Sequence, residues 1–187
     1  MRILVLFSLA FLTVPAWAST LYTATKMGTG LPSGAVFEAQ GINDSGQVAG
    51  LVAYNPPPSN WPYAAFVYSE RTMTNLGTLP GYPSASASAI NNSGQVAGTA
   101  VDSYGNPQEA ILYSGGLTIP LGTLGGAHSA TTDLNDSGQV VGWALDSSGN
   151  LRAFLYSGGT MTNLGTLGSY TNSSAVAINA GGQVPAI

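Results

Sequence analysis

The chain has no cysteine and only four lysine or arginine residues among 187. Without cysteine it can form no disulfide, thiol nucleophile or cysteine-ligated metal site, so its stability must come from packing. Eight acidic residues give a formal net charge of −4. A chain with so few cations lacks the basic stripe that a phosphate backbone requires. We therefore expect no nucleic-acid partner.

Groups suited to catalysis are scarce as well, because the chain has one histidine and eight scattered carboxylates. Acid–base catalysis needs titratable groups that converge on one point. His128 precedes Ser129 and is the candidate general base for a serine nucleophile, but no orienting acid lies near it in sequence. A solvated loop histidine is the better interpretation. We expect no enzyme, no catalytic residue and no cofactor.

Calcium is the most serious metal candidate, because Asp136 and Asp146 supply carboxylate oxygens in tight loops. Their spacing does not match an EF-hand. The positions equivalent to Asp136 elsewhere in the chain carry Asn92 and Ala180, so a repeated site would vary in charge. Turn formation explains these loops better, and we predict no metal site.

Residues 1–18 have the three parts of a secretory signal peptide. Arg2 precedes an apolar run over residues 3–14, and Ala16 and Ala18 form a small-x-small cleavage site. The run is shorter than the ~20 apolar residues that span a bilayer, although an uncleaved anchor is the alternative. We expect a mature domain of residues 19–187 that is extracellular or at the cell surface, with the periplasm as an alternative, and no stable membrane insertion after cleavage.

The strongest signal in the sequence is a repeat. The motif Asn-Asp-Ser-Gly-Gln-Val at Asn43 recurs in similar form at Asn91, Asn135 and Asn179, with steps of 48, 44 and 44 residues. A fixed period of this length indicates a solenoid, a propeller or another array. Tyr-Ser and Leu-Gly-Thr-Leu pairs keep the same phase, and for their tyrosines, Tyr68, Tyr113 and Tyr156, we expect a structural role between units.

Short apolar runs separated by glycine-containing turns predict four strands in each unit. In the third period these are residues 130–134, 139–145, 153–156 and 161–164. The fold class is therefore all-β, built from four-strand antiparallel meanders of about 44 residues. A unit of this size is typical of a propeller blade, partial or open here, with a β-solenoid or a sandwich of stacked meanders as alternatives.

The units occupy approximately residues 22–68, 72–113, 117–156 and 161–187, and the last is incomplete. Pro185 stands where the other copies have a strand residue that donates to the ladder. An open blade edge favours self-association. Asparagine-x-serine triplets begin at Asn43, Asn91, Asn135 and Asn172, but in three of them turn chemistry explains the pattern better than glycosylation.

The repeat resembles the bacterial HAF family of probable extracellular repeat proteins, whose units are similar to Ala153 through Leu167 followed by Ile178 through Val184. The histidine that names the family is replaced by Ala64, Glu109 and Arg152. The resemblance implies export and a propeller-like β-repeat, and it implies no catalytic residues.

Three functions remain open at this point. The first is a non-catalytic binding module for a protein or a glycan, with Trp61 and Tyr63 beside the proline-rich loop as the candidate ligand contacts. The second is a structural segment of a longer surface protein, suggested by the incomplete fourth unit. The third is a hydrolase or lyase on a propeller scaffold.

Overall fold

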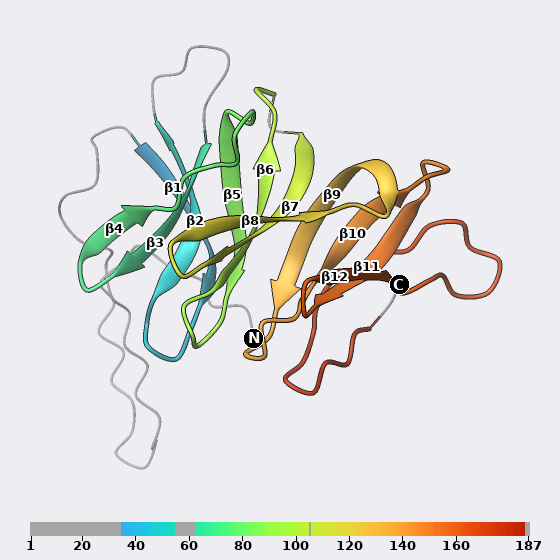
Figure 1. Cartoon of the computed structure of the whole chain (residues 1–187). Coiled ribbons are helices and arrows are strands. Elements are labelled where there is room, and N and C mark those ends of the chain that lie inside the picture. The colour runs from blue at the N-terminus through green and yellow to red at the C-terminus, as the bar shows by residue number, and fades with distance from the viewer. Residues whose placement is uncertain (1–34, 55–62, 105, 186–187) are drawn as a thin grey trace, which may run out of the picture.

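The computed structural model describes residues 35–54, 63–104 and 106–185. These residues contain twelve strands and no helix (Figure 1). The strands are β1 (Ala35–Ile42), β2 (Val48–Tyr54), β3 (Tyr63–Ser69), β4 (Thr72–Asn75), β5 (Ser84–Ile90), β6 (Val96–Val101), β7 (Pro107–Ser114), β8 (Leu117–Gly122), β9 (Gly125–Leu134), β10 (Val140–Asp146), β11 (Leu151–Ser157) and β12 (Thr160–Asn163).

Each group of four consecutive strands forms one antiparallel meander. The first sheet has the order β1-β2-β3-β4, the second β5-β6-β7-β8, and the third β9-β10-β11-β12. The predicted all-β meander fold is thus confirmed. The sheets are out of phase with the units drawn from the sequence, because those units begin at the fourth strand of one sheet and end at the third strand of the next.

The first two strands of every sheet share an irregularity that depends on glycine. The pairing register shifts between Ala39 and Gly41 of β1, between Ala87 and Ala89 of β5, and between Thr131 and Asp133 of β9. Each shift marks a β-bulge in the first strand of its sheet. Opposite each bulge the second strand carries Gly50, Gly98 or Gly142, and a Cβ there would collide with a first-strand carbonyl oxygen. The close approach of two backbones explains the repeated glycine.

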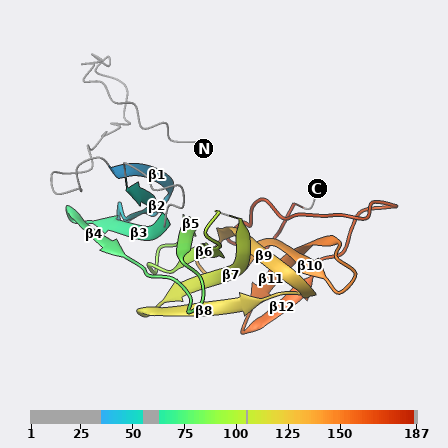
Figure 2. The same cartoon turned by 90° about the horizontal axis from the view of Figure 1, so that it is seen from above.

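The three sheets stack face to face in a row, like successive blades, and Figure 2 shows them side by side from above. Small side chains of one sheet meet larger side chains of the next in these shared cores. Ala49 and Ala65 of the first sheet share a core with Ile111 of the second. Ala97 and Ala110 of the second pack in the same way with Phe154 of the third. Alternating small and large residues let flat faces interdigitate without voids.

Polar side chains join adjacent sheets at buried positions. The Tyr113 hydroxyl donates to the carbonyl oxygen of Gly77, in the connection between the first and second sheets, at 2.9 Å, and burial raises its pKa. The same side chain shares a core with Ala49 and Ala65 of the first sheet, which confirms a structural role between sheets for this tyrosine. Ser129 on β9 accepts from the backbone N–H of Ala110 at 2.9 Å and donates to the carbonyl of Gly122 at 2.6 Å. Each of these buried hydroxyls therefore has a partner.

The outer face of the third sheet is covered by the segment that follows β12. Ala175 and Ile178 pack against Val141 and Ala153, and the Ala175 N–H donates to the carbonyl of Gly142 at 3.2 Å. The segment lies on the sheet as an extended chain without joining it as a fifth strand. Residues 173–178 thus occupy the first-strand position of a fourth unit, which we call the fourth-unit strand.

The stacked sheets form an open array in the part of the chain that is described, with no sheet closing on itself. This arrangement fits a propeller-like array and equally the alternative of stacked meanders. Over the same residues, no helix has the length and apolar character needed to cross a bilayer.

The glycine opposite each bulge gives a direct test of this packing. In Gly142→Ala, the new Cβ meets the Ala130 carbonyl oxygen and lies 3.0 Å from the ring of Phe154. We expect a loss of about 1–3 kcal/mol in the free energy of unfolding, measured by urea denaturation.

Gly181→Ala is the matched control for this substitution. Its Cβ would meet only the Asn179 side chain, at 3.4 Å, so its unfolding free energy should change by less than about 0.5 kcal/mol. Equal losses in the two variants would show that close backbone approach is not the reason for the glycine.

Candidate functional site

The most regular polar feature of the structure is the turn between the first and second strands of each unit. In the first unit, the Asn43 side-chain oxygen accepts from the backbone N–H groups of Ser45 at 3.1 Å and Gln47 at 2.9 Å. Gly46, with φ of 74°, donates its N–H to the Asn43 carbonyl. Asparagine supplies the acceptor and glycine the positive φ, which explains why the motif recurs.

The asparagine that closes each turn also joins that turn to the equivalent turn of the next unit. Its side-chain nitrogen Nδ2 donates one hydrogen to the glutamine of its own turn and the other to the backbone carbonyl of the next asparagine. The inter-unit bonds run from Asn43 to Asn91 at 3.0 Å, from Asn91 to Asn135 at 3.1 Å and from Asn135 to Asn179 at 3.1 Å. We call this row the asparagine ladder.

A second row of bonds runs beside the ladder, one residue further along each turn. The backbone N–H of Asp44 donates to Asn92 Oδ1, and that of Asn92 donates to Asp136 Oδ1, both at 2.8 Å. The Asn92 side-chain nitrogen donates to Asp44 Oδ2 at 2.8 Å and to Asp136 Oδ2 at 3.0 Å. One neutral amide therefore separates two carboxylates that would otherwise repel each other.

The four turns together border one shallow depression with a volume of about 220 Å³. Its apolar lining comes from the residue before each asparagine, namely Ile42, Ile90, Leu134 and Ile178. Its polar lining consists of the turn residues themselves, including Asp44, Asn92 and Asp136. We call this surface the turn face. It combines an apolar lining with carboxylate oxygens and amides, the mixture by which small polar ligands are held.

From the sequence, the Asn-x-Ser-Gly motifs were explained by turn formation alone, and it was not predicted that the four turns lie side by side. The signal was present in the constant spacing of the asparagines, because units that stack in register bring equivalent residues side by side. The sequence did not show that the asparagine side chain has a hydrogen left over for the next unit.

The candidate ligand contacts at Trp61 and Tyr63 are not tested by the structure. Trp61 lies outside the described residues. Tyr63 is the first residue of β3 and pairs with Ala53, but its side chain is not described. The predicted cleavage residues Ala16 and Ala18 also lie outside the described residues, so both proposals stay predictions.

Ser129, the nucleophile considered from the sequence, is fully buried, and both of its hydrogen bonds join sheets. No hydrogen bond joins it to His128 in the described part of the chain, where the buried Nδ1 of His128 has no partner. The pair therefore does not form a nucleophile–base arrangement. The loop assignment for His128 is wrong, because the residue lies within β9.

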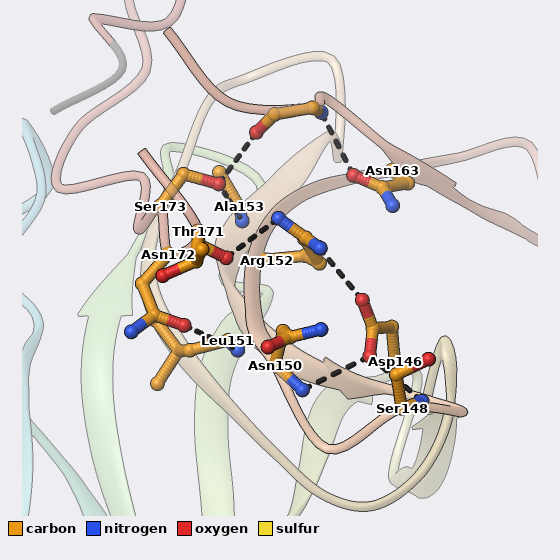
Figure 3. A network of polar contacts seen from close by, with 11 residues as sticks. Asp146, Ser148, Asn150, Leu151, Arg152, Ala153, Asn163, Thr171, Asn172 and Ser173 are labelled. Carbon is orange, nitrogen blue, oxygen red and sulfur yellow. Dashed lines mark hydrogen bonds and ion pairs between the residues drawn. The ribbon is translucent and has the colours of Figure 1, made fainter. Parts of the chain in front are cut away.

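The two carboxylates considered for calcium lie apart. Asp136 belongs to the turn before β10, and Asp146 is the last residue of that strand. Asp146 accepts from the backbone N–H groups of Ser148 and Asn150, both at 2.9 Å, and forms an ion pair with Arg152 at 2.8 Å (Figure 3). Among the described residues, no group of three or more histidine, aspartate or glutamate side chains is placed to hold a metal ion.

The asparagines of three predicted glycosylation triplets have structural roles. Asn43, Asn91 and Asn135 use Nδ2, the atom to which a glycan would be attached, in the asparagine ladder. Asn172 is exposed, and its side-chain oxygen accepts from the Leu151 N–H at 3.0 Å. Turn chemistry therefore accounts for the three turn triplets.

The contacts of Asp146 predict an acid-dependent loss of stability. Hydrogen bonds from Asn150 and then Arg152 lower the pKa of this carboxyl below its usual value of 3.8. Its contribution is therefore fully present above that value and is lost as the pH falls through the lower pKa of the folded state. Unfolding free energies measured by urea denaturation from pH 6 to pH 2 should fall less steeply for Asp146→Asn, and identical pH profiles would contradict the assignment.

The asparagine ladder predicts unequal costs for equivalent substitutions. Asn91 is buried and its side chain bonds both its own turn and the next unit. Asn179 is exposed, and among the described residues its side chain bonds only within its own turn. We expect urea denaturation to show a loss of about 2–4 kcal/mol for Asn91→Ala and about 1 kcal/mol for Asn179→Ala, and equal losses would exclude a role for the inter-unit bond.

Comparison with known proteins adds no functional assignment, because no family model, curated protein or solved structure matches the chain. The resemblance to exported HAF repeats accordingly stays a prediction from the sequence.

Proposed function

We propose that the chain is an exported, non-catalytic binding module that holds a glycan at the turn face. The observation that carries the proposal is the asparagine ladder, which fixes four turns side by side around one depression. A rigid row of turns is a preorganised surface, and preorganisation reduces the entropic cost of binding. The export signal and the extracellular repeat that the sequence resembles support a location outside the cell.

The chemistry of the turn face favours a hydroxyl-rich ligand. Asp44 and Asp136 offer carboxylate oxygens that accept from hydroxyl groups, and the backbone and side-chain amides of the turns add further polar groups. Ile42 is 52% exposed beside them and provides an apolar surface for the C–H face of a sugar ring. A phosphate-rich ligand is disfavoured, because it would approach two carboxylates on a chain whose formal net charge is −4.

The size of the depression limits what it can hold. At about 220 Å³ it is smaller than the roughly 300–1,000 Å³ of sites that enclose drug-sized ligands. An open depression of this size suits the end or edge of an oligosaccharide, with modest affinity from each contact. A repeat scaffold gains useful strength when several copies engage one multivalent surface.

A plug placed in the depression tests the proposal. Ala180 lines the turn face, is exposed, and lies outside the asparagine ladder, so Ala180→Trp should fill the site and leave the fold intact. We expect glycan-array screening of the purified protein to identify a bound oligosaccharide. Calorimetric titration with that oligosaccharide should then show at least a tenfold weaker affinity for the variant.

Ala127→Trp serves as the matched control, because Ala127 is an exposed alanine on β9 that does not line the depression. It should bind the oligosaccharide as the unmodified protein does. Equal affinity of the Ala180→Trp variant would place the ligand elsewhere, and an array without any bound glycan would contradict glycan binding itself.

A further inference from the structure

A second depression borders the turn of the second unit. Its volume is about 190 Å³, and Gly94 of that turn lines it, whereas Asn91 and Asn92 of the same turn line the turn face. Asn92 and Gly94 are two residues apart in the chain, so their Cα atoms are separated by at most about 7 Å. An oligosaccharide of a few sugars is longer than this distance and can reach both depressions. We call the second depression the hairpin pocket.

The hairpin pocket lies between the first and second sheets. One wall comes from residues 74–76, at the end of the first sheet, and the other from residues 113–117, which include the turn between β7 and β8. None of the residues that line it is charged. The turn face differs in this respect, because the carboxylates of Asp44 and Asp136 belong to its lining. The two depressions therefore favour different chemical groups.

The apolar part of the hairpin pocket depends on Leu117. This leucine is the first residue of β8, whereas β4 and β12 begin with Thr72 and Thr160. Its side chain is 67% exposed, and Leu76 and Tyr113 complete the apolar lining. A methyl group of a ligand placed against Leu117 would remove apolar surface from water, which favours binding.

The polar part of the pocket offers hydrogen-bond donors. Asn75 Oδ1 accepts from the Gly77 N–H at 2.8 Å, and the Asn75 Nδ2 makes no hydrogen bond in the described part of the chain. Ser114 Oγ accepts from the side-chain nitrogen of Gln95 at 3.1 Å, and its own hydrogen has no acceptor among the same residues. An amide and a hydroxyl with free hydrogens suit the carbonyl oxygen of a ligand.

We propose that the hairpin pocket holds the acetamido group of an N-acetylated glycan whose neighbouring sugars lie on the turn face. The inference rests on the function proposed above and names the class of glycan. An acetamido group combines a methyl group, a carbonyl oxygen and no charge. Its methyl group contacts Leu117 and Leu76, and its carbonyl oxygen accepts from Asn75 Nδ2 and Ser114 Oγ.

Other sugar substituents match the lining less well. A hydroxyl group alone leaves the exposed surface of Leu117 in water. A carboxylate or an ammonium group would lose its hydration without meeting an opposite charge in the pocket, which costs free energy. The volume of about 190 Å³ is below the roughly 300–1,000 Å³ of sites that enclose whole ligands, so it suits one substituent or one sugar of a longer chain.

Two tetrasaccharides with the same backbone test the proposal. Cellotetraose is built from glucose, and N-acetylchitotetraose carries an acetamido group in place of one hydroxyl of each glucose. Calorimetric titration of the purified protein measures the affinity for each. We expect N-acetylchitotetraose to bind at least tenfold more tightly, because the hydroxyl of cellotetraose does not fill the apolar part of the pocket.

Leu117→Thr tests the apolar part on the protein side. It introduces the residue that β4 and β12 carry at the same position, so the fold should be retained. The variant should bind N-acetylchitotetraose at least fivefold more weakly and cellotetraose as before. Leu167→Thr is the matched control, because Leu167 is 62% exposed and does not line the pocket. It should bind both tetrasaccharides as the unmodified protein does.

Asn75→Asp tests the polar part. It keeps an oxygen that accepts from the Gly77 N–H and removes both side-chain amide hydrogens, so it should bind N-acetylchitotetraose at least tenfold more weakly. Asn163→Asp is its control, because Asn163 accepts in the same way from the Gly165 N–H, at 2.7 Å, and lies outside the pocket. The control should leave both affinities unchanged.

Equal affinity for the two tetrasaccharides would overturn the inference, and so would unchanged binding by Leu117→Thr and Asn75→Asp. The function proposed above would survive either result if Ala180→Trp weakens the binding of both tetrasaccharides. Binding of neither tetrasaccharide would also overturn the inference. Glycan binding itself would fail only if the glycan array showed no bound oligosaccharide.

Discussion

The stacking of the units depends on the second side-chain amide hydrogen of each turn asparagine. An asparagine that only closed a turn would use its side-chain oxygen, and its amide hydrogens would be free for water. Here one amide hydrogen is used within the turn and the other reaches the backbone carbonyl of the next unit. Because Asn91 and Asn135 are buried, loss of this bond would leave donors and acceptors without solvent, which costs more than the bond itself contributes.

The ladder is compatible with the rest of the fold only because the sheets approach closely. Small residues such as Ala97 and Ala110 make one face of a sheet flat, and Phe154 from the next sheet fills the space against it. The bulge and its opposing glycine bring the first and second strands together at the same level of every unit. The turn hydrogen bonds, the packing between sheets and the glycine positions thus specify the same spacing between units. This agreement between local and long-range interactions favours a single native arrangement.

Much of the fold was predictable from local patterns. Alternating short runs and glycine turns predicted the four strands of a meander. The constant phase of Tyr113 with its leucine motif predicted a structural role between units, which its packing with Ala49 and Ala65 of the first sheet confirms. The fourth-unit strand was harder to recognise, because its side chains match a first strand although it is not one of the four strands of the third sheet. Sequence patterns report which face a side chain occupies and do not report whether an edge is paired.

The candidate site was less predictable than the fold. Asp136 was considered with Asp146 as a calcium ligand, but its two oxygens accept from Asn92, a residue 44 positions away. His128 was expected in a loop, but it lies within β9, and Ser129 beside it is buried between sheets with two hydrogen bonds, to Ala110 and Gly122. In each case the deciding partner comes from another unit, and no local motif encodes it.

The most direct test of the asparagine ladder is hydrogen exchange at the side-chain amides of the four turn asparagines, measured by nuclear magnetic resonance. The side chains of Asn43, Asn91 and Asn135 each donate to the next unit, whereas the side chain of Asn179 bonds only its own turn in the described part of the chain. The account predicts slow exchange for the side chains of Asn91 and Asn135, intermediate exchange for the partly buried Asn43 and fast exchange for Asn179. Equal, fast exchange at all four would contradict a ladder that holds the units together.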